Sequence, residues 1–155
     1  MAQRSAEEIT NTTIARVTMP KTTQGGKPKK NELPSTLQRS GAKAQRTFAK
    51  AHDAAVEEYG SEERAHRVAY SALKHSFEKV GDHWEAKERK GPSDKRAERG
   101  GLHNPIPSAE GVDANASKSH LLDIARRLDV RGRSTMDKSQ LVEAIKKHNR
   151  RVRGR

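Results

Sequence analysis

The aromatic residues of this 155-residue chain are confined to one stretch, which limits where a packed core can form. The chain has 2 Phe, 2 Tyr and 1 Trp, and all of them lie between Phe48 and Trp84. Large apolar side chains dominate protein cores, so we expect the main core in the middle of the chain. With 34% charged and 31% hydrophobic residues, the chain has too little apolar material for one large core, which favours small modules.

Two amphipathic helices are predicted within this stretch. The first has an apolar stripe at spacings of three and four residues, made of Ala44, Phe48, Ala51, Ala55 and Tyr59. This stripe predicts a helix over residues 42–59 that ends at Gly60. Ser61 is a suitable N-cap for the second helix, whose apolar face extends from Ala65 to Val80. We therefore expect the second helix to end at Gly81.

A second, smaller helical unit is predicted near the C-terminus. Leu121, Leu122, Ile124, Ala125 and Leu128 indicate a short amphipathic helix, which Gly132 interrupts. Asp137 and Gln140 have the spacing of a capping box at the start of another helix. The expected unit is helix, extended loop, helix.

Proline, glycine and charge patterns divide the chain into five segments. We expect a mainly α protein with a disordered basic arm (1–31), a compact helical module (32–90), a flexible linker rich in Gly and Pro (91–116), the smaller module (117–149) and a basic tail (150–155). Initiation at Met19 would make residues 1–18 an extension.

The net charge of +12 predicts an anionic partner, either DNA, RNA or an acidic membrane surface. Residues 117–155 carry 12 Lys and Arg against 4 Asp and Glu, whereas residues 33–90 carry 11 against 9. Most of the positive field therefore comes from the C-terminal quarter of the chain.

The first module resembles a known family. Leu33-Pro34, Ala44-Gln45, Tyr59, the run from His66 to His75 and then Trp84 are similar to the ChaB family of small bacterial proteins, described as cation transport regulators. The resemblance covers about residues 32–90. It implies a compact, mainly helical domain with a minor β element, and we expect that domain to engage a protein partner or a second site.

The run from Leu121 to Ile145 resembles the N-terminal helical module of transcription termination factor Rho, which is similar to helix-extended-loop-helix DNA binders of the SAP type. This resemblance covers about residues 117–149 and implies nucleic-acid binding. It does not imply termination activity, because the OB-fold and ATPase domain of Rho have no counterpart here and the chain has no GxxxxGK[ST] loop.

Basic side chains of the second module are the predicted nucleic-acid contacts. They are Arg126, Arg127, Arg131, Arg133, Lys138, Lys146, Lys147, Arg150 and Arg151. Such a cluster can neutralise phosphates and release counterions; the alternative is a solvated surface that aids solubility. The module has no aromatic residue for base stacking, so we expect binding to the backbone of DNA or RNA.

The 7 histidines do not form a recognisable metal motif. His66 and His75 are nine residues apart and point in opposite directions on one helix, so they cannot share an ion within it. A site assembled between helices stays open. We expect neither a metal nor a cofactor, and we interpret the histidines as residues that complete the packed face.

No catalytic constellation is recognisable, so we expect a protein that is not an enzyme and has no small-molecule substrate. There is no Cys, and no run approaches the roughly 18 apolar residues of a membrane span. We therefore expect a cytoplasmic nucleic-acid-binding accessory protein, linked to transcription termination or regulation. The alternative is a cytosolic regulator of a membrane cation transporter that acts through the ChaB-like module.

Overall fold

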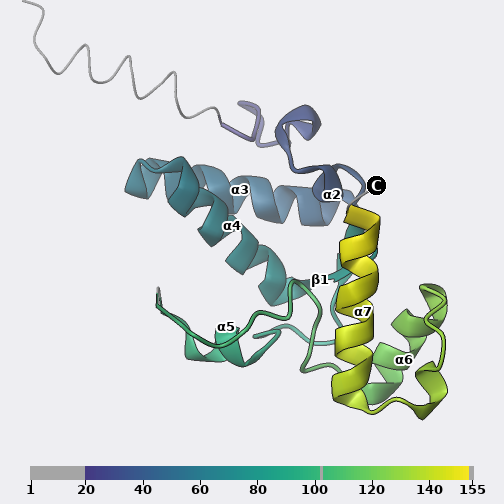
Figure 1. The fold of residues 1–155 in the computed structure, drawn as a ribbon. Coiled ribbons are helices and arrows are strands. Elements are labelled where there is room, and N and C mark those ends of the chain that lie inside the picture. Colours follow the sequence, from purple (N-terminus) through teal and green to yellow (C-terminus); the bar gives the residue numbers. More distant parts are fainter. Residues whose placement is uncertain (1–19, 102, 154–155) are drawn as a thin grey trace, which may run out of the picture.

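The computed structural model describes residues 20–101 and 103–153, which form helices around one small β-hairpin (Figure 1). In chain order the elements are η1 (Lys30–Glu32), α2 (Ser35–Gln38), α3 (Ala42–Tyr59), α4 (Glu62–Ser76), β1 (Phe77–Val80), β2 (His83–Ala86), α5 (Lys95–Arg99), α6 (Lys118–Arg127), η2 (Arg133–Thr135) and α7 (Lys138–Arg153). The expectation of a mainly helical protein is confirmed.

Helices α3 and α4 form the predicted pair. Gly60 ends α3 in the left-handed conformation with φ of 62°, and its N–H donates to the Val56 carbonyl. Ser61 then caps α4, because its side chain accepts a hydrogen bond from the Arg64 N–H. The two apolar faces enclose a core around Phe48 and Leu73, both fully buried.

The predicted end of the second helix was wrong. Helix α4 ends at Ser76, and Phe77–Val80 form a strand that pairs antiparallel with His83–Ala86. Gly81 lies in the turn between them with φ of 66°. The spacing of Phe77 and Val80 fits the apolar stripe of a helix and also fits a short strand, so the sequence pattern does not distinguish the two. The pairing with β2 decides in favour of the strand.

The structure does not show the expected flexible linker over residues 91–116. Ala109, Val112 and Ala116 are buried in the same cluster as Val80 and the smaller module. The Gly111 carbonyl accepts a hydrogen bond from the Lys79 N–H. This segment therefore fastens the smaller module to the hairpin, because it packs against both.

The expected N-terminal arm lies partly outside the described residues, which begin at residue 20. The first described turn is fastened to α3 by hydrogen bonds. The backbone N–H groups of Lys21 and Thr22 both donate to the Asp53 carboxylate, at 2.7 and 2.9 Å. Thr22 and Pro28 form an isolated antiparallel bridge that closes this turn.

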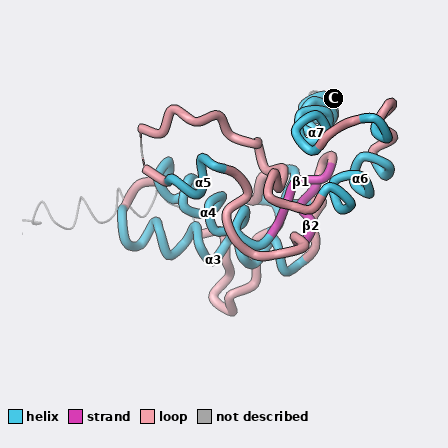
Figure 2. Tube along the Cα trace, turned by 90° about the horizontal axis from the view of Figure 1, so that it is seen from below, coloured by secondary structure: helices cyan, strands magenta, loops and turns pink. Residues whose placement is uncertain are grey.

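The smaller module has the predicted helix, loop, helix arrangement, with Leu121, Leu141 and Ile145 in its core. The capping box is present, since Asp137 and Gln140 exchange side-chain to backbone hydrogen bonds of 2.8 and 2.9 Å. Residues 150–153, expected in a basic tail, continue α7. Figure 2 shows the hairpin between α4 and the α6 and α7 pair.

We predict that Gly111→Ala destabilises the protein by more than its backbone conformation alone requires. Gly111 has φ of 93°, and a Cβ there would lie 2.8 Å from the Trp84 ring and 3.0 Å from the Lys79 Cβ. The left-handed conformation costs a non-Gly residue about 1–2 kcal/mol, and overpacking adds about 1–3 kcal/mol. Gly132→Ala is the matched control, because Gly132 has φ of 73° with nothing within 4 Å. Equal losses in free energy of unfolding, measured by urea denaturation, would contradict the packing argument.

Candidate nucleic-acid interface

The β-hairpin presents two chemically different faces. Strand register pairs Lys79 with Trp84 and Glu78 with Glu85. Since side chains alternate across a strand, Trp84 lies on the face toward the first module, and Glu78 and Glu85 lie on the opposite face with Val80. The second face meets helix α6, so the hairpin is shared by both modules.

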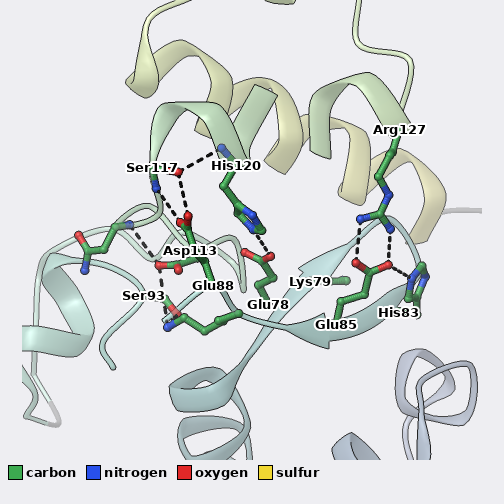
Figure 3. Close-up of polar contacts among 12 residues, drawn as sticks. Glu78, Lys79, His83, Glu85, Glu88, Ser93, Asp113, Ser117, His120 and Arg127 are labelled. Atoms are coloured by element: carbon green, nitrogen blue, oxygen red, sulfur yellow. Dashed lines mark hydrogen bonds and ion pairs between the residues drawn. The ribbon is translucent and has the colours of Figure 1, made fainter. Parts of the chain in front are cut away.

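Helix α6 supplies His120 and Arg127 to this acidic face (Figure 3). The His120 Nε2 lies 2.5 Å from the Glu78 Oε1. Arg127 makes a two-pronged contact with the Glu85 carboxylate, with its Nη1 2.9 Å from Oε2, and the other oxygen of Glu85 also contacts the His83 ring. The module is thereby held to the hairpin through hydrogen bonds, and those between Arg127 and Glu85 are charge-assisted.

The two glutamates of the hairpin have opposite pKa shifts. Burial raises the pKa of Glu78, and the hydrogen bond from His120 offsets this only in part. Hydrogen bonds from Arg127 lower the pKa of Glu85, because they favour the charged form. Glu85 therefore remains ionised at neutral pH and keeps its contact with Arg127.

Helix α7 makes a second set of contacts with the hairpin and the preceding segment. The buried Asn149 side chain accepts from the Gly81 N–H at 2.7 Å and donates to the Lys79 carbonyl at 3.1 Å. Arg150 forms two hydrogen bonds with the Glu110 carboxylate, at 2.7 and 2.8 Å. These hydrogen bonds lower the pKa of Glu110 and strengthen the ionic contact.

Four of the nine predicted nucleic-acid contacts have acidic partners within the chain. Arg127 and Arg150 hold the module in place as described, and Arg126 lies 3.5 Å from Asp123 on the surface of α6. Lys146 is only 8% exposed, and its Nζ lies 3.0 Å from Glu143. Arg127, Lys146 and Arg150 are thus less available to an external phosphate than their sequence positions indicate.

The other five predicted residues have no acidic partner within the described part of the chain. Four are exposed: Arg131, Lys138, Lys147 and Arg151. The fifth, Arg133, is half-buried and donates to the Val130 carbonyl. Lys147 and Arg151 are four residues apart on α7 and share one face of the helix.

A basic cleft between the two modules was not predicted from the sequence. It encloses about 500 Å³, and its lining includes Lys74, Lys79 and Arg153 beside Tyr70 and Trp84. Burial lowers the pKa of both lysines, because it disfavours their charged form. Residues from both modules line the cleft, so local sequence patterns give no signal for it.

Comparison with known proteins assigns the first module. Residues 33–87 match the family model described as ChaB. These residues form a ChaB domain. The ChaB domain begins before α2, contains α3 and α4, and ends just after β2, so the hairpin that carries the smaller module belongs to it.

Beyond the ChaB domain the comparisons add nothing. The ChaB match does not extend over α6 and α7, and no curated protein and no solved structure was found to be similar to the chain. Across residues 20–101 and 103–153, no helix has both the length and the apolar character needed to cross a membrane.

We predict that Arg127→Gln lowers stability at neutral pH and that the loss disappears in acid. The folded-state pKa of Glu85 is depressed, so its ion pair stabilises the fold above the ordinary glutamate pKa and is lost as pH falls through the depressed value. Because the pair is partly exposed, we expect at most about 1 kcal/mol. Urea denaturation across the pH range measures it. The control is Lys118→Gln, which removes an exposed cation of the same helix that has no ion pair among the described residues. A loss that is independent of pH would argue against the ion pair.

Proposed function

We propose that this chain is a non-enzymatic nucleic-acid-binding protein whose smaller module contacts the phosphate backbone of DNA or RNA. The observation that carries the proposal is the group of four exposed cations, Arg131, Lys138, Lys147 and Arg151, that have no acidic partner among the described residues. Cations of this kind can exchange bound counterions for phosphates without first breaking an internal ion pair.

Two further observations support the proposal. The module has the order helix, loop, helix that its resemblance to the Rho N-terminal module implies, and that resemblance is to nucleic-acid binders. The module is also held to the ChaB domain by buried apolar contacts and hydrogen bonds, so its outer face is presented by a rigid support. A rigid cationic surface loses little conformational entropy when it binds a polyanion.

The chemistry of this surface favours recognition of the backbone over the bases. Residues 117–153 contain no Phe, Tyr or Trp, so a base has no ring on which to stack. Lysine and arginine contacts to phosphate position a protein on a duplex but do not read its sequence. We therefore expect weak sequence preference and strong salt dependence.

We predict that the triple variant R131Q/K147Q/R151Q lowers affinity for a short DNA duplex and flattens its salt dependence. Each lost phosphate contact should reduce the slope of log affinity against log salt by about 0.9, so removal of three should reduce it by up to about 2.7. Fluorescence anisotropy at several salt concentrations measures both quantities, with an RNA hairpin as the second probe.

The matched control removes the same charge from the ChaB domain. Lys43, Arg46 and Lys50 are exposed on one face of α3 and have no ion pair among the described residues. K43Q/R46Q/K50Q should keep the slope of the unsubstituted chain if the proposed surface makes the contacts. Equal losses of affinity and slope in the two triple variants would mean that only the net charge matters. Absence of affinity in the unsubstituted chain at low salt would contradict the proposal.

The second candidate is a regulator of a membrane cation transporter that acts through the ChaB domain. The match of residues 33–87 to the ChaB family favours it, because the resemblance to that family implies a role in cation transport regulation. The two functions predict different partners of the full chain in a native lysate. Loss of all partners after nuclease treatment supports nucleic-acid binding, whereas co-purification of a transporter that survives nuclease supports the regulator.

A further inference from the structure

We propose that His52, Glu62 and His66 form a binding site for a divalent transition-metal ion of the zinc type, between α3 and α4 of the ChaB domain. This inference is independent of nucleic-acid binding, because the site lies outside the smaller module. His52 comes from α3, and Glu62 and His66 come from the first two turns of α4.

The three side chains already converge on one point. One ligand atom from each lies within 4.8 Å of the other two. The Glu62 Oε1 is 2.9 Å from the His52 Nε2 and 3.3 Å from the His66 Nε2. Zinc binds nitrogen at about 2.0–2.1 Å and oxygen at about 2.0–2.2 Å, so ligand atoms in a tetrahedral shell are about 3.3–3.5 Å apart. Small side-chain adjustments are therefore enough to place an ion between them.

The two neighbours of the His52 ring give a chemical reason for a cation at this point. Its Nδ1 lies 3.2 Å from the Asp53 Oδ1, and its Nε2 lies 2.9 Å from the Glu62 Oε1. A neutral imidazole has a single N–H, whereas both neighbours are carboxylates that only accept. When Nδ1 donates to Asp53, the lone pair on Nε2 faces a carboxylate oxygen. A metal ion between Nε2 and Glu62 turns this repulsion into two ligand bonds.

Asp53 is positioned like the carboxylates that orient metal-binding histidines in other proteins. Its carboxylate accepts from the Lys21 and Thr22 backbone N–H groups and from the Thr22 hydroxyl, at 2.7, 2.9 and 2.5 Å. Metal-binding histidines commonly donate their second ring N–H to such a carboxylate, which fixes the tautomer and orients the ring. His52 is fully buried and therefore held in place, because its side chain is 0% exposed.

The other two ligands leave an entry path. His66 and Glu62 are four residues apart on α4, which places them on one face, and their side chains are 37% and 35% exposed. An ion can enter from this side and bind water as a fourth ligand. The Glu62 Oε2 is buried without a hydrogen-bond partner, so the carboxylate has an unused oxygen at the same place. Two imidazoles and a carboxylate suit zinc better than the hard cations calcium and magnesium.

Lys21 is the counter-charge of the site in the absence of an ion. Its Nζ lies 3.8 Å from the Glu62 Oε1, and its side chain is 14% exposed. A divalent cation bound to Glu62 is repelled by this ammonium group. We therefore predict that Lys21→Met strengthens metal binding, because it removes this positive charge beside the site.

The test uses the full chain, stripped of metal with a chelator. Zn²⁺ affinity is measured by competition with a chromophoric chelator, and Co²⁺ is added separately so that its visible absorption reports the coordination geometry. We expect one ion per chain, with a tetrahedral Co²⁺ spectrum. His66→Ala and Glu62→Gln should each weaken Zn²⁺ binding at least 10-fold, and Asp53→Asn should weaken it about 10–100-fold. Lys21→Met should strengthen it.

The control is His75→Ala, which removes an exposed histidine from the same helix outside the cluster. It should leave the affinity unchanged, and circular dichroism checks that every variant is folded. Equal Zn²⁺ affinity in His66→Ala, Glu62→Gln and the unsubstituted chain would overturn the proposal. The absence of Zn²⁺ binding by the unsubstituted, folded chain would also overturn it.

Discussion

The junction between the two modules depends on two glutamates of the hairpin and on their contacts with α6. Glu78 and Glu85 lie directly opposite each other on the hairpin, an arrangement that destabilises a strand pair by itself. The His120 ring forms a hydrogen bond with Glu78, and Arg127 forms an ion pair with Glu85. The two carboxylates therefore gain these partners only when α6 is docked on the hairpin.

The rest of the junction follows from the small size of the hairpin. A two-stranded sheet is marginally stable without packing on both sides. Val80 belongs to the core of the smaller module, whereas Phe77 and Trp84 belong to the core of the ChaB domain. Asn149 satisfies backbone groups at the hairpin turn that would otherwise be buried without partners. Each module thus stabilises an element that the other one needs.

These interdependent contacts explain which parts of the structure were predictable from the sequence. The bounds of α3 and the cap at Ser61 depend on neighbouring residues, and local periodicity was sufficient to predict them. The strand at Phe77 depends on pairing with residues beyond the turn, and its spacing also fits a helix. The burial of Ala109 and Val112 depends on α6 and α7, so a segment rich in Gly and Pro looked like a linker.

The candidate sites also depend on partners that are far apart in the sequence. Composition correctly placed the positive charge in the C-terminal quarter, but it could not separate paired from unpaired cations. The partners of Arg127 and Arg150 are 42 and 40 residues away, well beyond any local pattern. The cluster of His52, Glu62 and His66 was not predicted for a related reason. Its side chains come from two helices, whereas spacing along one helix compares only His66 with His75.

The division between paired and unpaired cations also determines how ionic strength acts on the proposed function. Salt weakens phosphate contacts, and it screens exposed pairs such as Arg150 with Glu110 as well. Burial of Val80 and the Asn149 hydrogen bonds do not depend on ionic strength in this way. We therefore expect the module to stay docked at salt concentrations that would release a bound nucleic acid. Any affinity lost with salt would then report contacts to phosphate and not a change in the fold.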